Sequence, residues 1–191
     1  MALNSYLIGA AQMTSTADRA RNLDTAVRLV NEAADLGAKL VGLPENFAFM
    51  GPEEQRLAGA ETLEGPSVST LREVARRRGI WVVAGSIAEK VSDPKKTANT
   101  SVLIADDGTV AAAYRKIHLF DVQIPDGARY AESEVVVPGD MAIVAPTPLG
   151  RIGLTICYDL RFPELYRKLA GYGAQVITIP AAFTLYTGKD H

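Results

Sequence analysis

Gly150-Arg-Ile-Gly-Leu-Thr-Ile-Cys157-Tyr-Asp-Leu-Arg-Phe-Pro-Glu164 is the stretch of this chain that says most about its fold. An apolar run ends at Cys157, the only cysteine among the 191 residues, and a polar turn and a helical pattern follow. This order predicts a strand over 152–156 and a helix over 163–169. The thiol is then expected at a strand-to-helix turn, where unpaired backbone N–H groups and the positive end of the helix dipole favour a thiolate.

The rest of the chain alternates between strand and helix patterns. The run 6–11 is predicted to be a buried strand, and Asp106-Asp-Gly108 indicates a hairpin between the strands that flank it. This alternation is typical of an α/β fold in which helices cover sheets, and the length suits one domain. The further strands are expected over 40–43, 81–86, 99–104, 109–114 and 176–179, and the further helices from Asn22 to Gly37 and from a capping box at Thr70 to Gly79.

Three chemically reactive residues each follow a predicted strand. Glu45 comes after 40–43, Lys116 after 109–114 and Cys157 after 152–156. Because ligands of α/β proteins collect at the carboxyl ends of strands, we expect the three side chains to share a site. There a cysteine could attack a carbonyl or nitrile carbon while the carboxylate moves protons. The ammonium, with N–H groups after Cys157, would stabilise the developing negative charge.

Each of these residues also has a purely structural interpretation. A lone cysteine is often a small buried hydrophobe, a glutamate after a strand is often solvated, and Lys116 could be a charged sheet edge. His118 could serve as the base of a Cys–His pair, but a structural histidine packed behind Lys116 is the favoured interpretation. Two histidines and one cysteine give no metal-ligand spacing, and no phosphate or dinucleotide motif occurs, so neither a metal nor a cofactor is predicted.

Three blocks of the sequence together resemble a known family. The blocks Leu43-Pro-Glu-Asn46, Tyr114-Arg-Lys-Ile-His-Leu-Phe-Asp121 and Ile156-Cys-Tyr-Asp-Leu-Arg-Phe-Pro-Glu-Leu165 resemble, in order and spacing, the signature blocks of the nitrilase superfamily of carbon–nitrogen hydrolases. The resemblance runs from about Leu7 to His191 and implies an α-β-β-α sandwich. It implies that Cys157 is the nucleophile, Glu45 the general base and Lys116 the stabiliser of the tetrahedral intermediate.

The resemblance also implies a second glutamate that orients the lysine and positions substrate. Tyr130-Ala-Glu-Ser133 is similar to the family's block for this residue, which selects Glu132 over Glu134. Two further residues, Tyr158 and Arg161, are candidates for substrate binding. Arg161 is placed to receive a substrate carboxylate, although an ion pair with Asp159 or Glu164 is an equal alternative.

Within the superfamily, residues 116–121 and 161–165 most resemble the Nit branch of deaminated glutathione amidases and omega-amidases. The implied reaction is hydrolysis of a linear, non-peptide amide through a cysteine thioester. Residues 46–50 and the end Tyr186-Thr-Gly-Lys-Asp-His191 are more like the deaminated glutathione amidases. The alternatives are an omega-amidase, an aliphatic nitrilase or a carbamoyl-amide hydrolase.

The partner that the resemblance implies is a small-molecule amide substrate, and the composition gives no support for nucleic acid or a membrane. A net charge of −2 gives no case for nucleic acid or an anionic membrane, and no window is apolar enough for a membrane helix. A single cysteine and an N-terminus without a signal-peptide pattern fit a cytoplasmic location.

The end of the chain carries an expectation of its own. Members of the family that the chain resembles continue past the equivalent of His191, so the carbon–nitrogen hydrolase domain over 1–191 is expected to be incomplete at its C-terminus. An open strand edge and apolar face would favour a homo-oligomer. The non-enzymatic alternative is an inactive, truncated chain that self-associates.

Overall fold

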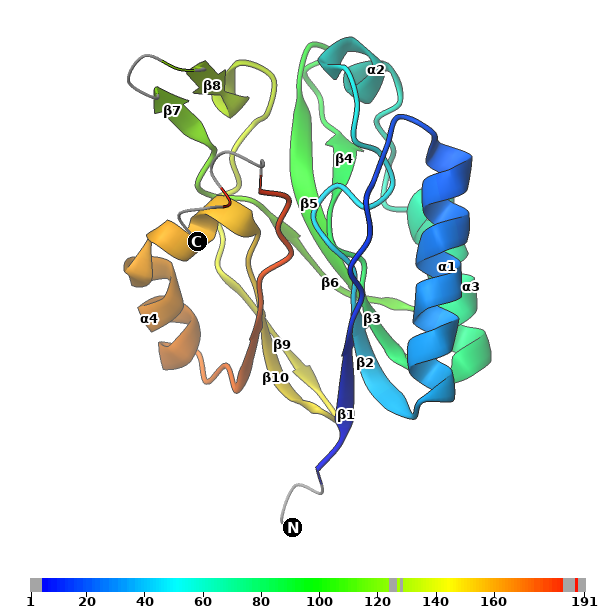
Figure 1. Cartoon of the computed structure of the whole chain (residues 1–191). Helices are drawn as coiled ribbons and strands as arrows, with labels where there is room; N and C mark the ends of the chain where they lie inside the picture. The colour runs from blue at the N-terminus through cyan, green and yellow to red at the C-terminus, as the bar shows by residue number, and fades with distance from the viewer. Residues whose placement is uncertain (1–4, 124–126, 128, 184–187, 189–191) are drawn as a thin grey trace.

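The computed structural model describes residues 5–123, 127, 129–183 and 188, and its larger sheet has six strands (Figure 1). The central strand β5 pairs along one edge with β4 through residues 97–100 and with β3 through residues 103 and 104, and along its other edge with β6. β1, β2 and β3 run parallel to one another, whereas β5 is antiparallel to its partners. The six strands are β1 (Leu7–Ala10), β2 (Ala38–Gly42), β3 (Trp81–Val83), β4 (Ile87–Lys90), β5 (Thr97–Ile104) and β6 (Val110–Arg115).

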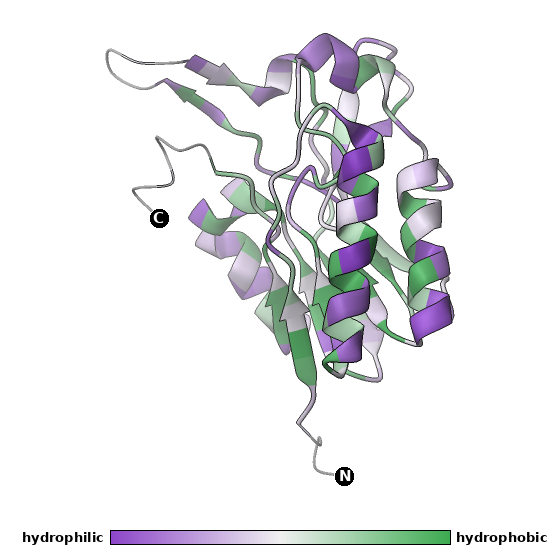
Figure 2. Cartoon of the chain, turned by 45° about the vertical axis from the view of Figure 1, so that its right-hand side comes forward, coloured by the Kyte–Doolittle hydropathy of each residue, from purple (hydrophilic) through white to green (hydrophobic). Residues whose placement is uncertain are grey.

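Two long helices cover the outer face of this sheet. They are α1 (Arg19–Asp35) and α3 (Pro66–Arg78), and Figure 2 shows hydrophilic and hydrophobic residues alternating along them. On α1 the fully buried Ala26 and Val30 belong to one core cluster with Val41 and Val82 of the sheet, as expected for an amphipathic helix. The Asp18 carboxylate caps α1 by accepting the backbone N–H of Arg21 at 3.0 Å.

A second, smaller sheet faces the inner side of the first. It consists of β9 (Ile143–Thr147), β10 (Gly150–Leu154) and β11 (Val176–Thr178), and α4 (Pro163–Gly171) covers its outer face (Figure 1). Leu40 and Val83 of the first sheet share a core cluster with Ile152 and Leu154 of the second. The described residues therefore form the α-β-β-α layers that the family resemblance implies.

Short elements gather at one end of the sandwich. They are α2 (Glu53–Ala58), the hairpin of β7 (Asp121–Gln123) and β8 (Arg129–Ala131), and the 3-10 helices η1 (Glu132–Glu134) and η2 (Cys157–Arg161). The sequence analysis did not anticipate α2, β4, β7, β8 or β9, which are short or lack a clear hydrophobic period. None of the helices in the described residues is both long and apolar enough to cross a membrane.

Three local predictions were wrong. The strand near 6–11 lies at the edge of the sheet, and Leu7 and Ile8 are 59% and 53% exposed instead of buried. The helix predicted from Thr70 already begins at Pro66, whose fixed φ suits a first helical turn. The strand predicted over 81–86 ends at Val83, because the chain bends at Gly85, where φ is +27°. Apart from Gly188, the block 186–191 lies outside the described residues.

Candidate active site

Four side chains from distant parts of the sequence converge at the end of the sandwich that holds the short elements. Glu45 follows β2, Lys116 follows β6, Glu132 opens η1 and Cys157 opens η2. The Lys116 Nζ atom lies 3.2 Å from Glu45 Oε1 and 2.9 Å from Glu132 Oε2, and the Cys157 thiol is hydrogen-bonded to Glu45. Glu45, Lys116 and Cys157 are all buried. The structure thus brings together the four residues proposed from the sequence as catalytic.

The charges in this cluster support one another. Burial by itself lowers the pKa of Lys116, because removing an ammonium from water disfavours its charged form. The neighbouring carboxylates of Glu45 and Glu132 outweigh burial and raise that pKa above its ordinary value. Lys116 is therefore a permanent cation at neutral pH, held between two carboxylates.

Glu132 is held on the lysine by the backbone as well. Its Oε2 atom accepts the backbone N–H of Phe120 at 2.7 Å in addition to the Lys116 ammonium. Its Oε1 atom accepts the side-chain amide of Asn99 at 3.2 Å. The sequence analysis did not identify Asn99, which is buried in the first half of β5 among the polar residues Thr97, Thr100 and Ser101 and carries no motif.

Cys157 occupies a strained backbone position at the turn between β10 and α4. Its φ is +48°, a left-handed conformation that costs a non-glycine residue on the order of 1–3 kcal/mol. The turn is held by the Cys157 N–H, which donates to the Pro180 carbonyl at 2.9 Å, and by Asp159, whose carboxylate accepts the Ile156 N–H at 2.9 Å. The strain therefore falls on the residue that carries the reactive thiol.

The expectation of a stabilised thiolate was wrong for the resting site. Burial, followed by the charge and the hydrogen bond of the Glu45 carboxylate, raises the pKa of the Cys157 thiol to about 12. Lys116 and the Ala182 N–H act in the opposite direction but do not compensate. At neutral pH the cluster therefore pairs a neutral thiol with a carboxylate that can take its proton.

Comparison with known proteins places this cluster in a family. Residues 7–191 match the family described as carbon-nitrogen hydrolase. The chain belongs to the carbon–nitrogen hydrolase family. It is 45% identical over 192 aligned residues to the deaminated glutathione amidase of Synechocystis sp. (strain PCC 6803 / GT-S), covering 99% of this chain and 71% of that protein.

Solved structures of the superfamily share the fold. The C. elegans NitFhit protein matches with a TM-score of 0.90 at 39% identity, covering 97% of this chain and 46% of that one. The amidase from Nesterenkonia sp. AN1 matches with a TM-score of 0.79 at 30% identity, covering 95% of this chain and 69% of that one. That structure is of a glutamate-to-glutamine mutant and records Michael addition of acrylamide at the active-site cysteine.

In this carbon–nitrogen hydrolase, His118 is part of the scaffold of the turn at Cys157. Its Nδ1 atom lies 2.7 Å from Asp159 Oδ1, and its ring stacks on Phe162 with the centroids 3.7 Å apart. Asp159 is fully buried and also accepts the Tyr114 hydroxyl at 2.7 Å. The structural interpretation of His118 therefore fits its contacts, and Asp159 is the partner that sequence reasoning did not find.

The two candidate substrate-binding residues both lie on η2, next to Cys157. The Tyr158 ring packs edge-on against Phe120 and Phe162, with centroid distances of 5.0 and 5.4 Å. Arg161 is exposed at the end of the same 3-10 helix. Of the two carboxylates considered as its partners, Asp159 pairs with His118 and Glu164 pairs with Arg167 at 2.9 Å.

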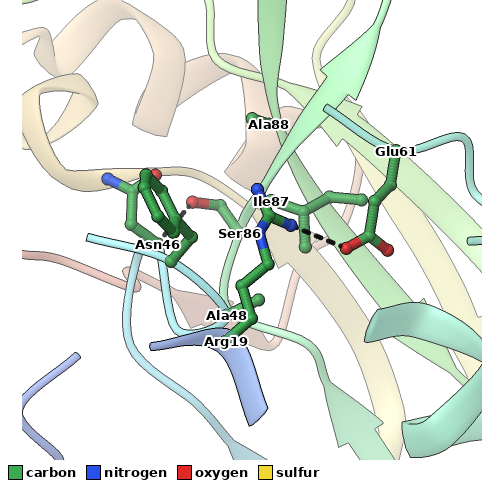
Figure 3. Close-up of a pocket in the computed structure, with 8 residues that line it drawn as sticks. Arg19, Asn46, Ala48, Glu61, Ser86, Ile87 and Ala88 are labelled. Atoms are coloured by element: carbon green, nitrogen blue, oxygen red, sulfur yellow. Dashed lines mark hydrogen bonds and ion pairs between the residues drawn. The ribbon is translucent and has the colours of Figure 1, made fainter. Parts of the chain in front are cut away.

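The turn that carries Glu45 is tied to the sheet. Asn46 has φ +55°, and its N–H donates to the Ser86 hydroxyl at 3.0 Å. Both line a small cavity of about 10 Å³, across which Arg19 and Glu61 form an ion pair at 3.0 Å (Figure 3). This space suits a single water molecule and contains neither Cys157 nor Lys116, so we assign it a role in packing behind the Glu45 turn. In the part of the chain that the structure describes, no group of three or more His, Cys, Asp or Glu side chains is arranged to hold a metal.

Gly85 is needed for the placement of Glu45. Its φ is +27°, and a Cβ atom there would lie 1.8 Å from the Pro44 carbonyl oxygen, directly before Glu45. Gly85→Ala should therefore lower the free energy of unfolding by at least about 2 kcal/mol and also reduce activity in the molecules that remain folded. Urea denaturation and an activity assay measure the two effects.

Gly171→Ala is the matched control, because a Cβ at Gly171 would meet nothing within 4 Å. Helix propensity favours alanine at this position by up to about 1 kcal/mol. We expect normal activity and no loss of stability. Equal behaviour of the two variants would contradict the close approach of Gly85 to the Glu45 turn.

Proposed function

We propose that this chain hydrolyses the linear amide of a small carboxylic acid through a thioester on Cys157, with a specificity like that of deaminated glutathione amidases. The observation that carries the proposal is the buried cluster in which Lys116 bridges Glu45 and Glu132 while Glu45 accepts the Cys157 thiol. The similarity to the Synechocystis deaminated glutathione amidase supports the substrate class.

In the first half of the reaction, the Cys157 sulfur attacks the amide carbon and its proton passes to Glu45. The carbonyl oxygen becomes an oxyanion, which the Lys116 ammonium stabilises. The N–H of Tyr158 can assist, because the first N–H groups of a helix have no acceptor within it. Glu45 then returns the proton to the nitrogen and the C–N bond breaks. Ammonia leaves from a primary amide and an amine from a substituted one, and a thioester remains.

In the second half, Glu45 takes a proton from a water molecule, which attacks the thioester carbon. Collapse of this second intermediate breaks the C–S bond and returns the proton to the sulfur. The sum is amide plus water giving carboxylic acid plus ammonia for a primary amide, or plus an amine for a substituted one. Glu45 acts as both base and acid, and the neutral resting thiol suits this role because the proton has only one hydrogen bond to cross.

The test is release of the leaving nitrogen compound from a panel of substrates: cysteinylglycine from deaminated glutathione, and ammonia from alpha-ketoglutaramate, acetamide, an aliphatic nitrile and a carbamoyl amide. We expect the alpha-keto acid amides to react fastest, with a thioester adduct visible by intact-protein mass spectrometry. Preference for alpha-ketoglutaramate would indicate an omega-amidase, and preference for the nitrile or the carbamoyl amide would indicate those activities. Failure to hydrolyse any of them would overturn the proposal and favour an inactive chain that self-associates.

Arg161 is proposed to bind the carboxylate of the substrate, because it ends the 3-10 helix that begins at Cys157. Arg161→Met should raise KM for deaminated glutathione about tenfold, the value of one charge-assisted hydrogen bond, and leave hydrolysis of uncharged acetamide unchanged. Arg167→Met, at an exposed cation on α4, is the control and should change neither. Equal losses on both substrates would exclude Arg161 from carboxylate recognition.

Two finer expectations from the sequence stay predictions. A homo-oligomer is tested by sedimentation equilibrium, which should give a mass above the 20.4 kDa of one chain. A cytoplasmic location is tested by cell fractionation.

A further inference from the structure

Asn99 closes a ring of hydrogen bonds around the charged cluster. Its side-chain Nδ2 lies 2.9 Å from Glu45 Oε1 and 3.2 Å from Glu132 Oε1. Lys116 bridges the same two carboxylates from the other side, at 3.2 and 2.9 Å. Glu45 and Glu132 therefore each have one donor from an ammonium and one from a side-chain amide, besides one backbone N–H, that of Ala182 at 3.0 Å for Glu45 and that of Phe120 at 2.7 Å for Glu132.

The orientation of the Asn99 amide follows from its surroundings. The NH₂ group has two N–H donors, and both carboxylates accept from it, so the ring uses its full donor capacity. A flipped amide would place its oxygen against two carboxylates, which electrostatic repulsion forbids. In this orientation the buried Asn99 Oδ1 atom has no hydrogen-bond partner in the described residues, which lowers the stability of the fold.

Asn99 also holds Lys116 through the backbone. Its carbonyl accepts the Lys116 N–H at 2.8 Å, at the point where β6 ends beside β5. One residue on a rigid central strand thus fixes the backbone of the lysine and the side chains of both glutamates. The side chain of Asn99 is 1% exposed, so water does not substitute for it.

A neutral amide has a property here that a second cation would lack. The amide donates hydrogen bonds without adding a positive charge, so it holds Glu45 in place without neutralising the carboxylate that is to accept the proton. Lys116 spends two of its three N–H donors on the glutamates, and the direction of the third is fixed by the first two. That third donor is the one available to a substrate oxygen.

We propose that Asn99 is a positioning residue that holds Glu45 and Glu132 apart around Lys116, so that Glu45 faces the Cys157 thiol and one lysine N–H faces the substrate. This inference rests on the proposed amide hydrolysis. Without the amide, the Glu132 Oε1 atom loses its hydrogen bond and can turn onto Lys116, where it occupies the donor meant for the oxyanion, and the Glu45 Oε1 atom is left to Lys116 alone. Loss of a donor to an ionised carboxylate also disfavours its charged form, so the general base is ionised only at higher pH.

The experiment compares Asn99→Leu, which removes the amide at similar volume, with Asn99→Asp, which keeps the shape and adds a carboxylate. For Asn99→Leu we expect kcat to fall about a hundredfold with KM nearly unchanged. The acidic limb of the kcat profile should move to higher pH in Asn99→Leu and further in Asn99→Asp. Full activity in Asn99→Leu, or a loss with an unmoved pH profile, would overturn the proposal.

Asn22→Leu is the matched control for folding. Asn22 is equally buried, and its Nδ2 donates to the carbonyls of Thr16 and Ala48 at 2.7 and 3.0 Å, whereas its side chain makes no hydrogen bond to Glu45, Lys116, Glu132 or Cys157. We expect a comparable drop in thermal stability with no change in the pH profile. A pH shift in Asn22→Leu equal to that of Asn99→Leu would reduce the role of Asn99 to general stability.

A readout that needs no substrate separates this inference from the proposed function. At about pH 9, well below the pKa of Cys157, the rate of alkylation by iodoacetamide is proportional to the small thiolate fraction. The added charge in Asn99→Asp should slow alkylation about tenfold, whereas Asn22→Asp should not. If the wild type hydrolyses no amide but the two aspartate variants differ in alkylation rate, the proposed function fails and the placement of Asn99 at the Glu45–Cys157 pair stands. If the two variants are alkylated at the same rate, that placement is wrong.

Discussion

Cys157→Ala is expected to abolish amide hydrolysis, with kcat/KM falling on the order of 10⁴-fold or more, while the fold persists. The reason is that the proposed reaction forms a covalent bond to the sulfur, and no other thiol exists in the chain. Neither Glu45 nor Lys116 can replace the nucleophile, because each already has the other as a partner. Ammonia release measures the rate, and circular dichroism checks the fold.

Cys157→Gly is the informative companion variant. It also lacks the thiol, but glycine adopts the φ of +48° without a steric cost. We expect it to unfold with a free energy about 1 kcal/mol higher than Cys157→Ala and to be equally inactive. Hydrolysis that survives in either variant would mean that the nucleophile is not Cys157, and a less stable glycine variant would mean that the turn is not strained.

The arrangement of the layers and the convergence of the site could be predicted from the sequence, because both depend on patterns that are local. Apolar runs of four to six residues mark strands such as 40–43, and reactive residues directly after them mark the ends of strands. Glu45, Lys116 and Cys157 could be proposed in this way from single positions. The hairpin of β5 and β6 was predicted by Asp106-Asp-Gly108 alone and is confirmed by the antiparallel register of the two strands.

The residues that hold the site could not be predicted, because their roles depend on contacts between distant segments. Asn99 looks like one polar residue in a buried strand, and Asp159 like a surface aspartate of a polar turn. Only the fold places the first between two glutamates and the second beneath His118 and Tyr114. The exposure of β1 was missed for a similar reason, since an apolar strand at a sheet edge has the same sequence as one at the centre.

The protonation state of Cys157 shows the same limit. A cysteine at a helix start suggests a stabilised thiolate, but that inference counts only local dipoles. In the structure, burial and the Glu45 carboxylate oppose those dipoles and raise the pKa of the thiol to about 12. The reactivity of the site therefore depends on proton transfer to Glu45 and not on a resting thiolate.

Glu45→Gln is expected to change the rate of amide hydrolysis and the rate of Cys157 alkylation in opposite directions. Hydrolysis should fall about 10²- to 10⁴-fold, because the amide of glutamine cannot take the thiol proton or return it to the leaving nitrogen. Alkylation of Cys157 by iodoacetamide at about pH 9 should become faster, because the charge that raises the pKa of the thiol is gone. Below that pKa, each unit of decrease raises the thiolate fraction tenfold.

Lys116→Met should change the rate of Cys157 alkylation in the direction opposite to that of Glu45→Gln. The Lys116 ammonium lowers the pKa of Cys157, so its removal should slow alkylation while also abolishing hydrolysis. Glu134→Gln, at an exposed carboxylate paired with Arg129, serves as the control and should alter neither rate.

Slower alkylation in Glu45→Gln would contradict the assignment of Glu45 as the proton acceptor, since Glu45 would then increase the reactivity of the thiol by holding it in place. If both variants are inactive towards amides, a faster alkylation in Glu45→Gln and a slower one in Lys116→Met would identify Glu45 as the proton acceptor and Lys116 as the electrostatic stabiliser. A structural defect shared by the two variants would instead move both alkylation rates in the same direction.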